Sequence, residues 1–275
     1  MYNQPYRPRR RRSRFAKVMT GIVIAAVALL IVTAAVLYIC GFRYISTETG
    51  SGLRIRFIGT VDSDGTPRRG MIRYSDGTSA TYDASTGVLS YSSGDTYEGG
   101  LSRMMKSGSG RLVCANGDVY EGEFQNDLIE GRGKLTSSGG DVYEGTFVSG
   151  KFDGEGTYTW ADGTVYTGTF KEGRRDGTGE IKYSYGDTYT GEYSENMKMG
   201  RGTYTWANGD VYEGEFQNDV RSGHGVYRWA NGEVYEGEFR DNLMNGHGTF
   251  TWPGGRVYTG NFENGVIVRT DDDAE

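Results

Sequence analysis

A repeat of 23 residues organises most of this chain. Tyrosines recur at that interval, with no insertion or deletion between them, at Tyr97, Tyr120, Tyr143, Tyr166, Tyr189, Tyr212, Tyr235 and Tyr258. Each one opens a five-residue box such as YEGEF or YTGTF. In the regular units the box is followed by Gly-x-Gly, an alternating run such as TYTW, and a turn pair such as Asn-Gly or Asp-Gly. A fixed period of this length predicts an array in which every unit packs against its neighbours.

Side chains alternate within each unit as they do in β-strands. Tyr, Gly and Phe of the box YEGEF point to one side, and Gly156, Tyr158 and Trp160 share a side in the run GTYTW. Each unit is therefore predicted to be two short strands, with Asn-Gly and Asp-Gly providing the positive φ of tight connections. Mid-strand glycines are expected to let a neighbouring ring lie flat against the backbone. Whether both aromatic sets share one face stays open, because a one-residue change of register would flip every side chain.

The amino-acid composition fits such an array and excludes two other classes of protein. The chain has 45 Gly and 21 Tyr among 275 residues, but only 4 Pro and 2 Cys. Glycine does not recur at every third residue and proline is rare, which excludes collagen, and two cysteines cannot form a disulfide scaffold. Tyrosine and tryptophan rows are expected to replace the missing aliphatic core.

The box Tyr-x-Gly-x-Phe, the Gly-x-Gly after it and the glycine that closes each unit resemble the MORN (membrane occupation and recognition nexus) repeat. The resemblance is strong over residues 97–265 and weaker over 57–96. It implies an all-β fold, an elongated single-layer antiparallel sheet of tandem 23-residue hairpins. It also implies a binding, scaffolding or membrane-tethering role, and phospholipid binding has been proposed for some members. Some MORN arrays accompany lipid kinase or methyltransferase domains, but residues 1–56 leave no room for one, so we expect no enzyme.

One apolar segment precedes the repeats. Residues 18–42 carry no charge over 25 positions, and about 20 residues suffice for a helix to cross the hydrocarbon core. A cleaved signal peptide is the competing interpretation, but apolar residues continue beyond Ala34 and Ala35, where polar sequence should follow a cleavage site. A retained transmembrane helix is therefore favoured.

Charge is distributed unevenly along the chain. Eight of the 30 basic residues lie between Arg7 and Arg43 and all 36 acidic residues follow them, so the chain beyond Arg43 carries −14. Basic residues beside a spanning helix stay cytoplasmic, which predicts a cytoplasmic N-terminus and an extracytoplasmic array. The Arg9 to Arg12 cluster also resembles a nucleic-acid-binding patch. Its place beside the helix instead favours a role in setting the membrane topology and in attracting anionic lipid, so we expect no nucleic-acid partner.

The expected parts follow in chain order. They are a basic cytoplasmic tail (1–17), a transmembrane helix (18–42), a stalk (43–56), degenerate N-terminal repeats acting as a cap (57–96), the MORN array (97–265), and a C-terminal cap with an acidic tail (266–275). We predict an edge strand at 266–269, with Asp271 to Asp273 discouraging edge-to-edge pairing.

Neither a catalytic site nor a metal site is expected. His224 and His247 are the only histidines and lie one repeat apart, so their backbones would be about 9.6 Å from each other, too far for one metal unless the side chains converge. Repeated carboxylates such as Glu121 and Glu123 predict a solvated sheet face. The alternative is that these carboxylates bind calcium, but their spacing fits neither the helix–loop–helix calcium site nor the nonapeptide β-roll. We expect no cofactor.

A binding surface is the remaining expectation, and the C-terminal half is its predicted place because Cys114 and Ser137 stand where later units have Trp. The partner would be a protein segment, a glycan or a second copy of the array. The alternative is a module that binds phospholipid and bridges two bilayers, which the acidic array disfavours. The candidate binding residues are Tyr166, Tyr189, Trp206, Tyr212, Trp229, Tyr235 and Trp252.

Overall fold

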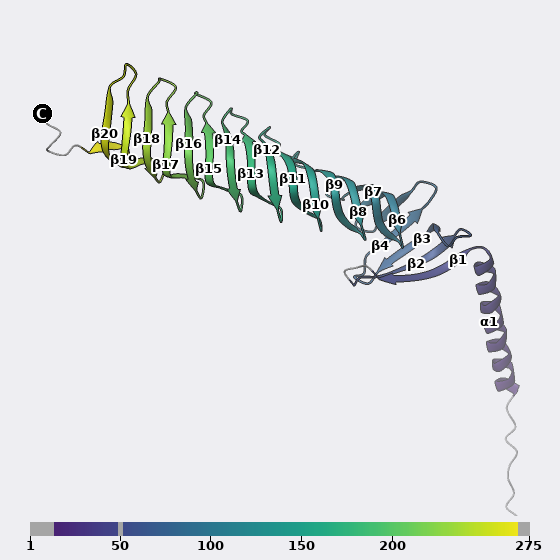
Figure 1. Ribbon diagram of the computed structural model, residues 1–275. Helices are drawn as coiled ribbons and strands as arrows, with labels where there is room; N and C mark the ends of the chain where they lie inside the picture. The colour runs from purple at the N-terminus through teal and green to yellow at the C-terminus, as the bar shows by residue number, and fades with distance from the viewer. Residues whose placement is uncertain (1–13, 49–51, 269–275) are drawn as a thin grey trace, which may run out of the picture. The chain divides into compact units, whose positions relative to one another are not determined.

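The computed structural model describes residues 14–48 and 52–268. It divides the chain into two compact units, Met1–Ser92 and Ser93–Glu275 (Figure 1). In each unit, successive strands pair antiparallel in chain order. The all-β class and the tandem antiparallel hairpins are therefore confirmed.

The first unit is a helix followed by a small sheet. Its elements are α1 (Arg14–Ile39), β1 (Phe42–Glu48), β2 (Arg54–Val61), β3 (Pro67–Tyr74), β4 (Ser79–Asp83) and β5 (Val88–Tyr91). Ile55, Phe57, Ile72 and Leu89 are fully buried and form its core. The expected stalk at 43–56 is wrong, because most of its described part is strand: β1 pairs along its whole length with β2.

The helix ends earlier than expected, at Ile39 rather than residue 42. Gly41 has a φ of +81°, and its N–H bonds the carbonyl of Tyr38, so the chain turns here into β1. Residues 22–39 have a mean hydropathy of 3.0 and none is buried in the protein. By length and composition this helix is a candidate membrane span or signal sequence. Of the expected basic tail (1–17), residues 1–13 lie outside the described residues and residues 14–17 belong to α1.

The second unit is a row of hairpins lying side by side in chain order (Figure 1). Even-numbered strands carry the tyrosine box: β6 (Thr96–Ser102), β8 (Val119–Gln125), β10 (Val142–Val148), β12 (Val165–Lys171), β14 (Thr188–Ser194), β16 (Val211–Gln217), β18 (Val234–Arg240) and β20 (Val257–Glu263). Odd-numbered strands carry Gly-x-Gly: β7 (Met105–Val113), β9 (Leu128–Thr136), β11 (Lys151–Thr159), β13 (Arg174–Lys182), β15 (Met197–Thr205), β17 (Val220–Arg228) and β19 (Leu243–Thr251). The final strand, β21 (Val266–Val268), pairs with β20 as predicted, and residues 269–275 lie outside the description.

The two glycines of Gly-x-Gly have different tasks. The first glycine lies in a β-bulge, as at Gly154, which has a φ of +92°. Between the pairs Gly145–Gly156 and Phe147–Phe152, one residue of β10 lies opposite three residues of β11. The second, Gly156, lies under the ring of Tyr143, where an added Cβ would lie 2.5–2.7 Å from ring atoms. The prediction that mid-strand glycine makes room for a ring is therefore confirmed.

An aromatic ladder forms the core of the array. From Tyr120 to Tyr235, each box tyrosine meets, edge to face, the aromatic fifth residue of its own box and that of the next, whereas Tyr97 meets only Phe124 and Tyr258 only Phe262; the ring centres are 4.9–5.6 Å apart. The first seven box tyrosines are at most 1% exposed. Their hydroxyls donate to the carbonyl three residues on, as from Tyr143 to Thr146 (2.9 Å). This ladder replaces an aliphatic core.

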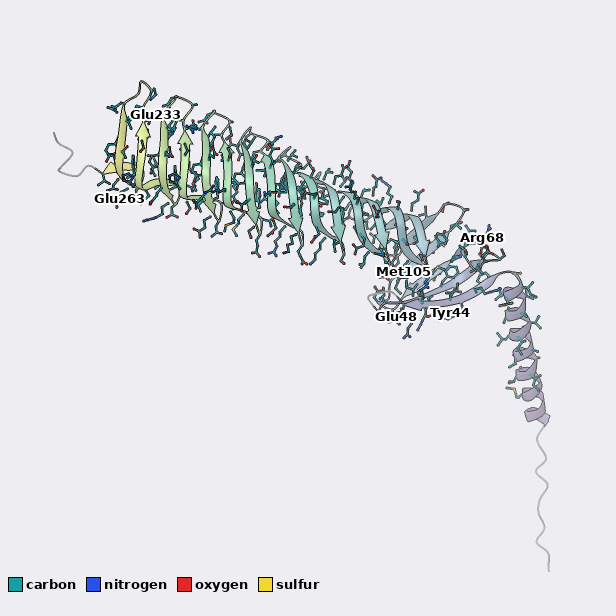
Figure 2. All side chains as sticks on the ribbon, viewed as in Figure 1. Tyr44, Glu48, Arg68, Met105, Glu233 and Glu263 are labelled. Atoms are coloured by element: carbon teal, nitrogen blue, oxygen red, sulfur yellow. The ribbon has the colours of Figure 1, made fainter. Side chains whose placement is uncertain are left out.

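Hydrogen bonds join neighbouring repeats at both edges of the sheet. Figure 2 marks the edges by Glu233, in a wide loop, and Glu263, beside a narrow turn. At the wide loops, Asp210 accepts hydrogen bonds from the N–H of Ala230 (2.8 Å) and the hydroxyl of Tyr227 (2.9 Å) in the next repeat.

At the narrow turns, both central residues have positive φ, as in Asn218 (+51°) and Asp219 (+68°). These two-residue turns were not predicted, whereas the glycines of Asn-Gly and Asp-Gly do have the predicted positive φ.

Candidate functional site

Both aromatic sets lie on one face of the array. Tyr143 of β10 pairs directly with Tyr158 of β11, and Tyr158 pairs in turn with Tyr166 of β12. Directly paired residues in a sheet point to the same side. We call this side the aromatic face. The question that the sequence left open is thereby answered: the box and the second aromatic run share a face.

A row of tryptophans runs along the aromatic face beside the wide loops. Trp206 lies 4.5 Å from Tyr204 in its own repeat and 5.1 Å from Tyr227 in the next, measured between ring centres. Trp229 repeats this arrangement, 4.4 Å from Tyr227 and 5.4 Å from Phe250. The tryptophan row consists of Trp160, Trp206, Trp229 and Trp252, and all four are partly exposed.

The seven predicted binding residues divide into two groups. Tyr166, Tyr189, Tyr212 and Tyr235 are 0% exposed, so in this conformation they belong to the core and offer no surface to a partner. Trp206, Trp229 and Trp252 are partly exposed and are available for contact. The candidate surface is thereby narrowed to the tryptophan row.

Three cations lie over these rings in successive repeats. Arg175, Lys198 and Arg221 occupy the second position of β13, β15 and β17. Arg175 lies 5.1 Å from the Tyr193 ring centre, Lys198 the same distance from Tyr204, and Arg221 5.3 Å from Trp206. We call these three residues the cation row, and together with the tryptophan row they form the aromatic-cation strip.

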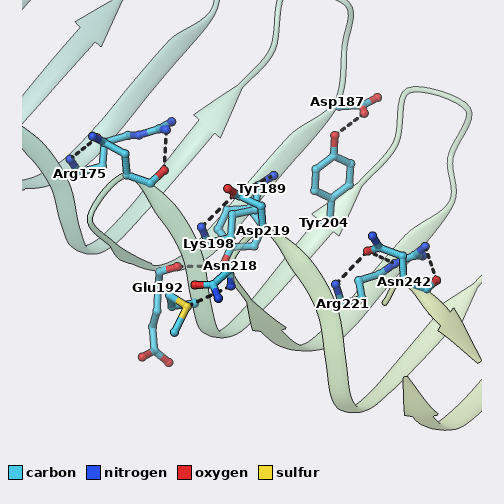
Figure 3. A network of polar contacts seen from close by, with 12 residues as sticks. Arg175, Asp187, Tyr189, Glu192, Lys198, Tyr204, Asn218, Asp219, Arg221 and Asn242 are labelled. Carbon is cyan, nitrogen blue, oxygen red and sulfur yellow. Dashed lines mark hydrogen bonds and ion pairs between the residues drawn. The ribbon is translucent and has the colours of Figure 1, made fainter. Parts of the chain in front are cut away.

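Each cation is held by the narrow turn of the next repeat (Figure 3). Arg221 donates to the carbonyl of Asn242 at 2.8 Å, and Arg175 donates to that of Asn196 at 2.7 Å. Lys198 lies 3.9 Å from the carboxylate of Asp219. The guanidinium groups of Arg175 and Arg221 form no ion pair with a carboxylate in residues 14–48 and 52–268.

Burial dominates the electrostatics of the cation row. The Lys198 side chain is 14% exposed, and desolvation lowers its pKa although Asp219 opposes the shift. Desolvation likewise lowers the pKa of Arg221. Arg221 keeps its charge at neutral pH, because an arginine guanidinium is effectively always protonated in proteins. The strip therefore places positive charge in a partly dry, aromatic setting, where an arriving anion would be screened less than at an open surface.

Sequence reasoning missed the cation row. The signal was present, because the three cations share one slot of the 23-residue period with Lys106, and that slot holds Ile129, Phe152 and Met244 in other repeats. Arg174 and Arg175 are adjacent in the sequence, where they resemble one basic patch together with Lys171. The structure separates them: Arg174 is exposed and pairs with Glu195 (3.3 Å), whereas Arg175 points to the aromatic face.

The opposite face of the array is polar. An open hollow of about 420 Å³ on it is lined by Arg201, Glu213, Glu215 and His224, among others. His224 pairs with Glu238 across strands, not with His247, and both histidines are exposed. No three potential metal ligands cluster anywhere in the described ranges. Not all repeated carboxylates are merely solvated: Glu123 accepts a hydrogen bond from the N–H of Arg132 at the bulge (3.3 Å).

Comparison with known proteins identifies the repeat. The model of the MORN repeat matches seven consecutive segments: 97–119, 120–142, 143–165, 166–188, 189–211, 212–234 and 235–255. Among curated proteins, none matches the chain.

Similar solved structures are distant. The SAS-4 (dCPAP) TCP domain of Drosophila melanogaster, in complex with a proline-rich motif of Ana2, has a TM-score of 0.36 at 16% identity and covers 57% of this chain and 85% of its own. The TCP10 domain of Danio rerio CPAP, in complex with a STIL peptide, has a TM-score of 0.36 at 13% identity. The match covers 80% of this chain and 100% of that domain. A streptogramin B lyase has a TM-score of 0.17 at 12% identity, and the match covers 82% of this chain and 84% of the lyase. These TM-scores are too low to establish a shared fold.

Proposed function

Because this chain belongs to the MORN repeat family, we propose that it is a non-catalytic binding or scaffolding protein that recognises a protein partner through its aromatic-cation strip. The observation that carries the proposal is the partly exposed tryptophan row beside three cations, two of which have no carboxylate partner in the described residues. Tryptophan, tyrosine and arginine are the residues that dominate binding energy at protein interfaces. A second copy of the chain is one form that this partner can take.

Membrane anchoring by α1 is part of the proposal. The helix is long and apolar, and its residues 22–39 are not buried against the rest of the protein. With basic residues on its N-terminal side, the N-terminus would be cytoplasmic and the repeats would lie on the other side. The protein would then display its strip to partners outside the cytoplasm.

Crosslinking and mass spectrometry on intact cells tests the proposal. The full-length chain is compared with the double variant Trp206→Ala/Trp229→Ala and with Tyr44→Ala, which removes a 62% exposed ring from the first unit. We expect a crosslinked partner that the Tyr44 variant retains and the double variant loses. Equal recovery from all three proteins would reject the strip as the binding site.

Phospholipid binding is the competing function. The chain beyond Arg43 carries −14, which repels anionic lipid, and Arg174 and Arg175 do not offset this as one basic patch, because they lie on opposite faces of the sheet. Stronger flotation of the protein with anionic than with neutral vesicles at physiological salt would favour lipid over protein as the partner, because the apolar helix α1 inserts into both.

A further inference from the structure

The cation row has a regular spacing that constrains what can bind it. Arg175, Lys198 and Arg221 occupy the same position of β13, β15 and β17, and one even-numbered strand separates each from the next. Strands in a sheet lie about 4.8 Å apart, so successive cations lie about 9.6 Å apart along the array. The row is bounded, since the same slot holds Phe152 before it and Met244 after it.

From Trp206 to Trp252 the tryptophan row has the same spacing and runs beside the cations, while Tyr183 occupies the slot between Trp160 and Trp206. Trp206 and Trp229 are one repeat apart, and Arg221 lies 5.3 Å from the Trp206 ring. A ligand that satisfies both rows must therefore present an anionic group and an apolar surface once every 9.6 Å or so.

Extended peptide in the polyproline II conformation matches this period. It has three residues per turn and rises about 3.1 Å per residue, so equivalent side chains recur on one side every 9.3 Å or so. Over the two intervals of the cation row, the accumulated mismatch is only about 0.6 Å.

The other regular peptide conformations fit less well. Side chains seven residues apart on an α-helix are about 10.5 Å apart, which accumulates about 1.8 Å of mismatch over the same two intervals. In a β-strand, residues on one side recur about every 6.8 Å, and residues three apart point to opposite sides.

We propose that the aromatic-cation strip binds an extended acidic segment of a protein partner, in the polyproline II conformation, with carboxylates at every third residue. Three carboxylates, at positions i, i+3 and i+6, meet Arg175, Lys198 and Arg221. The intervening residues, proline among them, lie on Trp206 and Trp229, because proline-rich segments dock in aromatic-lined grooves. Charge complementarity supports this occupant: Arg175 and Arg221 have no carboxylate partner in the described residues, in a chain that is otherwise acidic. This inference rests on the proposed function, and it adds the chemistry and spacing of the ligand.

Peptide binding to the full-length chain in neutral nanodiscs tests the proposal. The probe is a fluorescent nonapeptide, three repeats of Asp-Pro-Pro, and its affinity is measured by anisotropy. One control peptide has the same composition with its three aspartates adjacent, and a second has serine in place of aspartate. We expect the phased peptide to bind at least about tenfold more tightly than either control, a difference of about 1.4 kcal/mol.

Matched protein variants assign the binding to the cation row. R175Q/R221Q removes two charges from the aromatic face, whereas R174Q/R240Q removes two charges from exposed positions on the same or neighbouring strands. We expect the first pair to lose at least about tenfold in affinity and the second to stay within about twofold. R175K/R221K keeps the charges and should retain most of the binding, which separates loss of charge from loss of fold.

Three outcomes would overturn the inference: equal binding of the phased and clustered peptides, equal loss in both glutamine pairs, or binding of phosphatidylserine vesicles that R175Q/R221Q abolishes. The proposed function is judged separately. If the phased peptide fails to bind but the crosslinked partner still depends on Trp206 and Trp229, the function stands and the acidic ligand is wrong. If the partner is also indifferent to those tryptophans, both fail.

Discussion

The guanidinium group of Arg221 lies 5.3 Å from the centre of the Trp206 ring, which belongs to the preceding repeat. The arginine comes from β17 and is held by the carbonyl of Asn242 in the narrow turn after β18. One contact therefore joins a turn, a cation and an indole from three successive repeats. The binding strip and the packing of the array share the same residues, so the array must be intact for the strip to form.

The buried hydroxyls of the box tyrosines should contribute to stability. Tyr143→Phe leaves the carbonyl of Thr146 without its 2.9 Å hydrogen bond in a buried site, which should cost about 1–3 kcal/mol. Tyr44→Phe is the control, because Tyr44 is 62% exposed. Urea unfolding followed by circular dichroism compares the two variants, and an equal midpoint for both would show that the hydroxyl has no such role.

The glycine beneath each tyrosine ring should tolerate no side chain. In Gly156→Ala the new Cβ would lie 2.5 Å from the Tyr143 hydroxyl, so the ring or the strand must move, at a cost of about 3 kcal/mol. Gly139→Ala is the control, because its Cβ would meet nothing closer than the Ser137 hydroxyl at 3.5 Å. Thermal unfolding should rank Gly156→Ala far below Gly139→Ala; similar melting temperatures would contradict the close packing of ring on glycine.

Cross-repeat hydrogen bonds at the wide loops should couple neighbouring units. Asp210→Ala removes acceptors for Ala230 and Tyr227, and we expect a loss of about 1–2 kcal/mol. Glu233→Ala changes the same slot one repeat later, where the carboxylate accepts from Asn231 within its own loop, and should cost less than about 0.5 kcal/mol. Hydrogen exchange should report faster exchange at Ala230 only in the first variant, and unchanged exchange there would argue against coupling.

Alkaline pH should unfold the array. Burial raises the pKa of Tyr120, Tyr143 and Tyr212 from 10.0 to about 12. The unfolded chain releases these protons near pH 10 and the folded chain only near pH 12, so their stabilisation is complete below pH 10 and is lost as pH rises toward 12. Phenolate absorbance and loss of β-sheet signal should therefore rise together in this window. Ionisation of these tyrosines near pH 10 in a folded array would contradict their burial.

The sequence predicted the repeating fold because the period fixes it. Tyr-x-Gly-x-Phe alternates with period two, and Gly-x-Gly recurs at a constant distance from it, so strands, turns and ring-on-glycine packing could all be inferred. The shared aromatic face could not, because it depends on the length of the turns: Val148 pairs with Lys151 across two residues, and a turn one residue longer or shorter would place the two aromatic sets on opposite faces.

The candidate site was only partly predictable. Tyr166 and Trp206 look alike in the sequence as periodic aromatics, yet the first is fully buried and the second is partly exposed. Arg175 and Arg221 were missed because charged residues in strands are usually solvated, and only the narrow turn of the next repeat holds these two over the rings. The strand β1 was missed because a polar segment that alternates weakly gives little strand signal.

Photo-crosslinking from two adjacent residues tests whether the aromatic-cation strip is the binding surface. A photoreactive phenylalanine analogue is placed at Trp229, on the aromatic face, or at Arg228, the exposed last residue of β17, in the full-length chain in intact cells. We expect position 229 to capture a protein partner and position 228 to capture none. Capture of the same partner from 228 alone, or equally from both positions, would show that the aromatic-cation strip is not the binding surface.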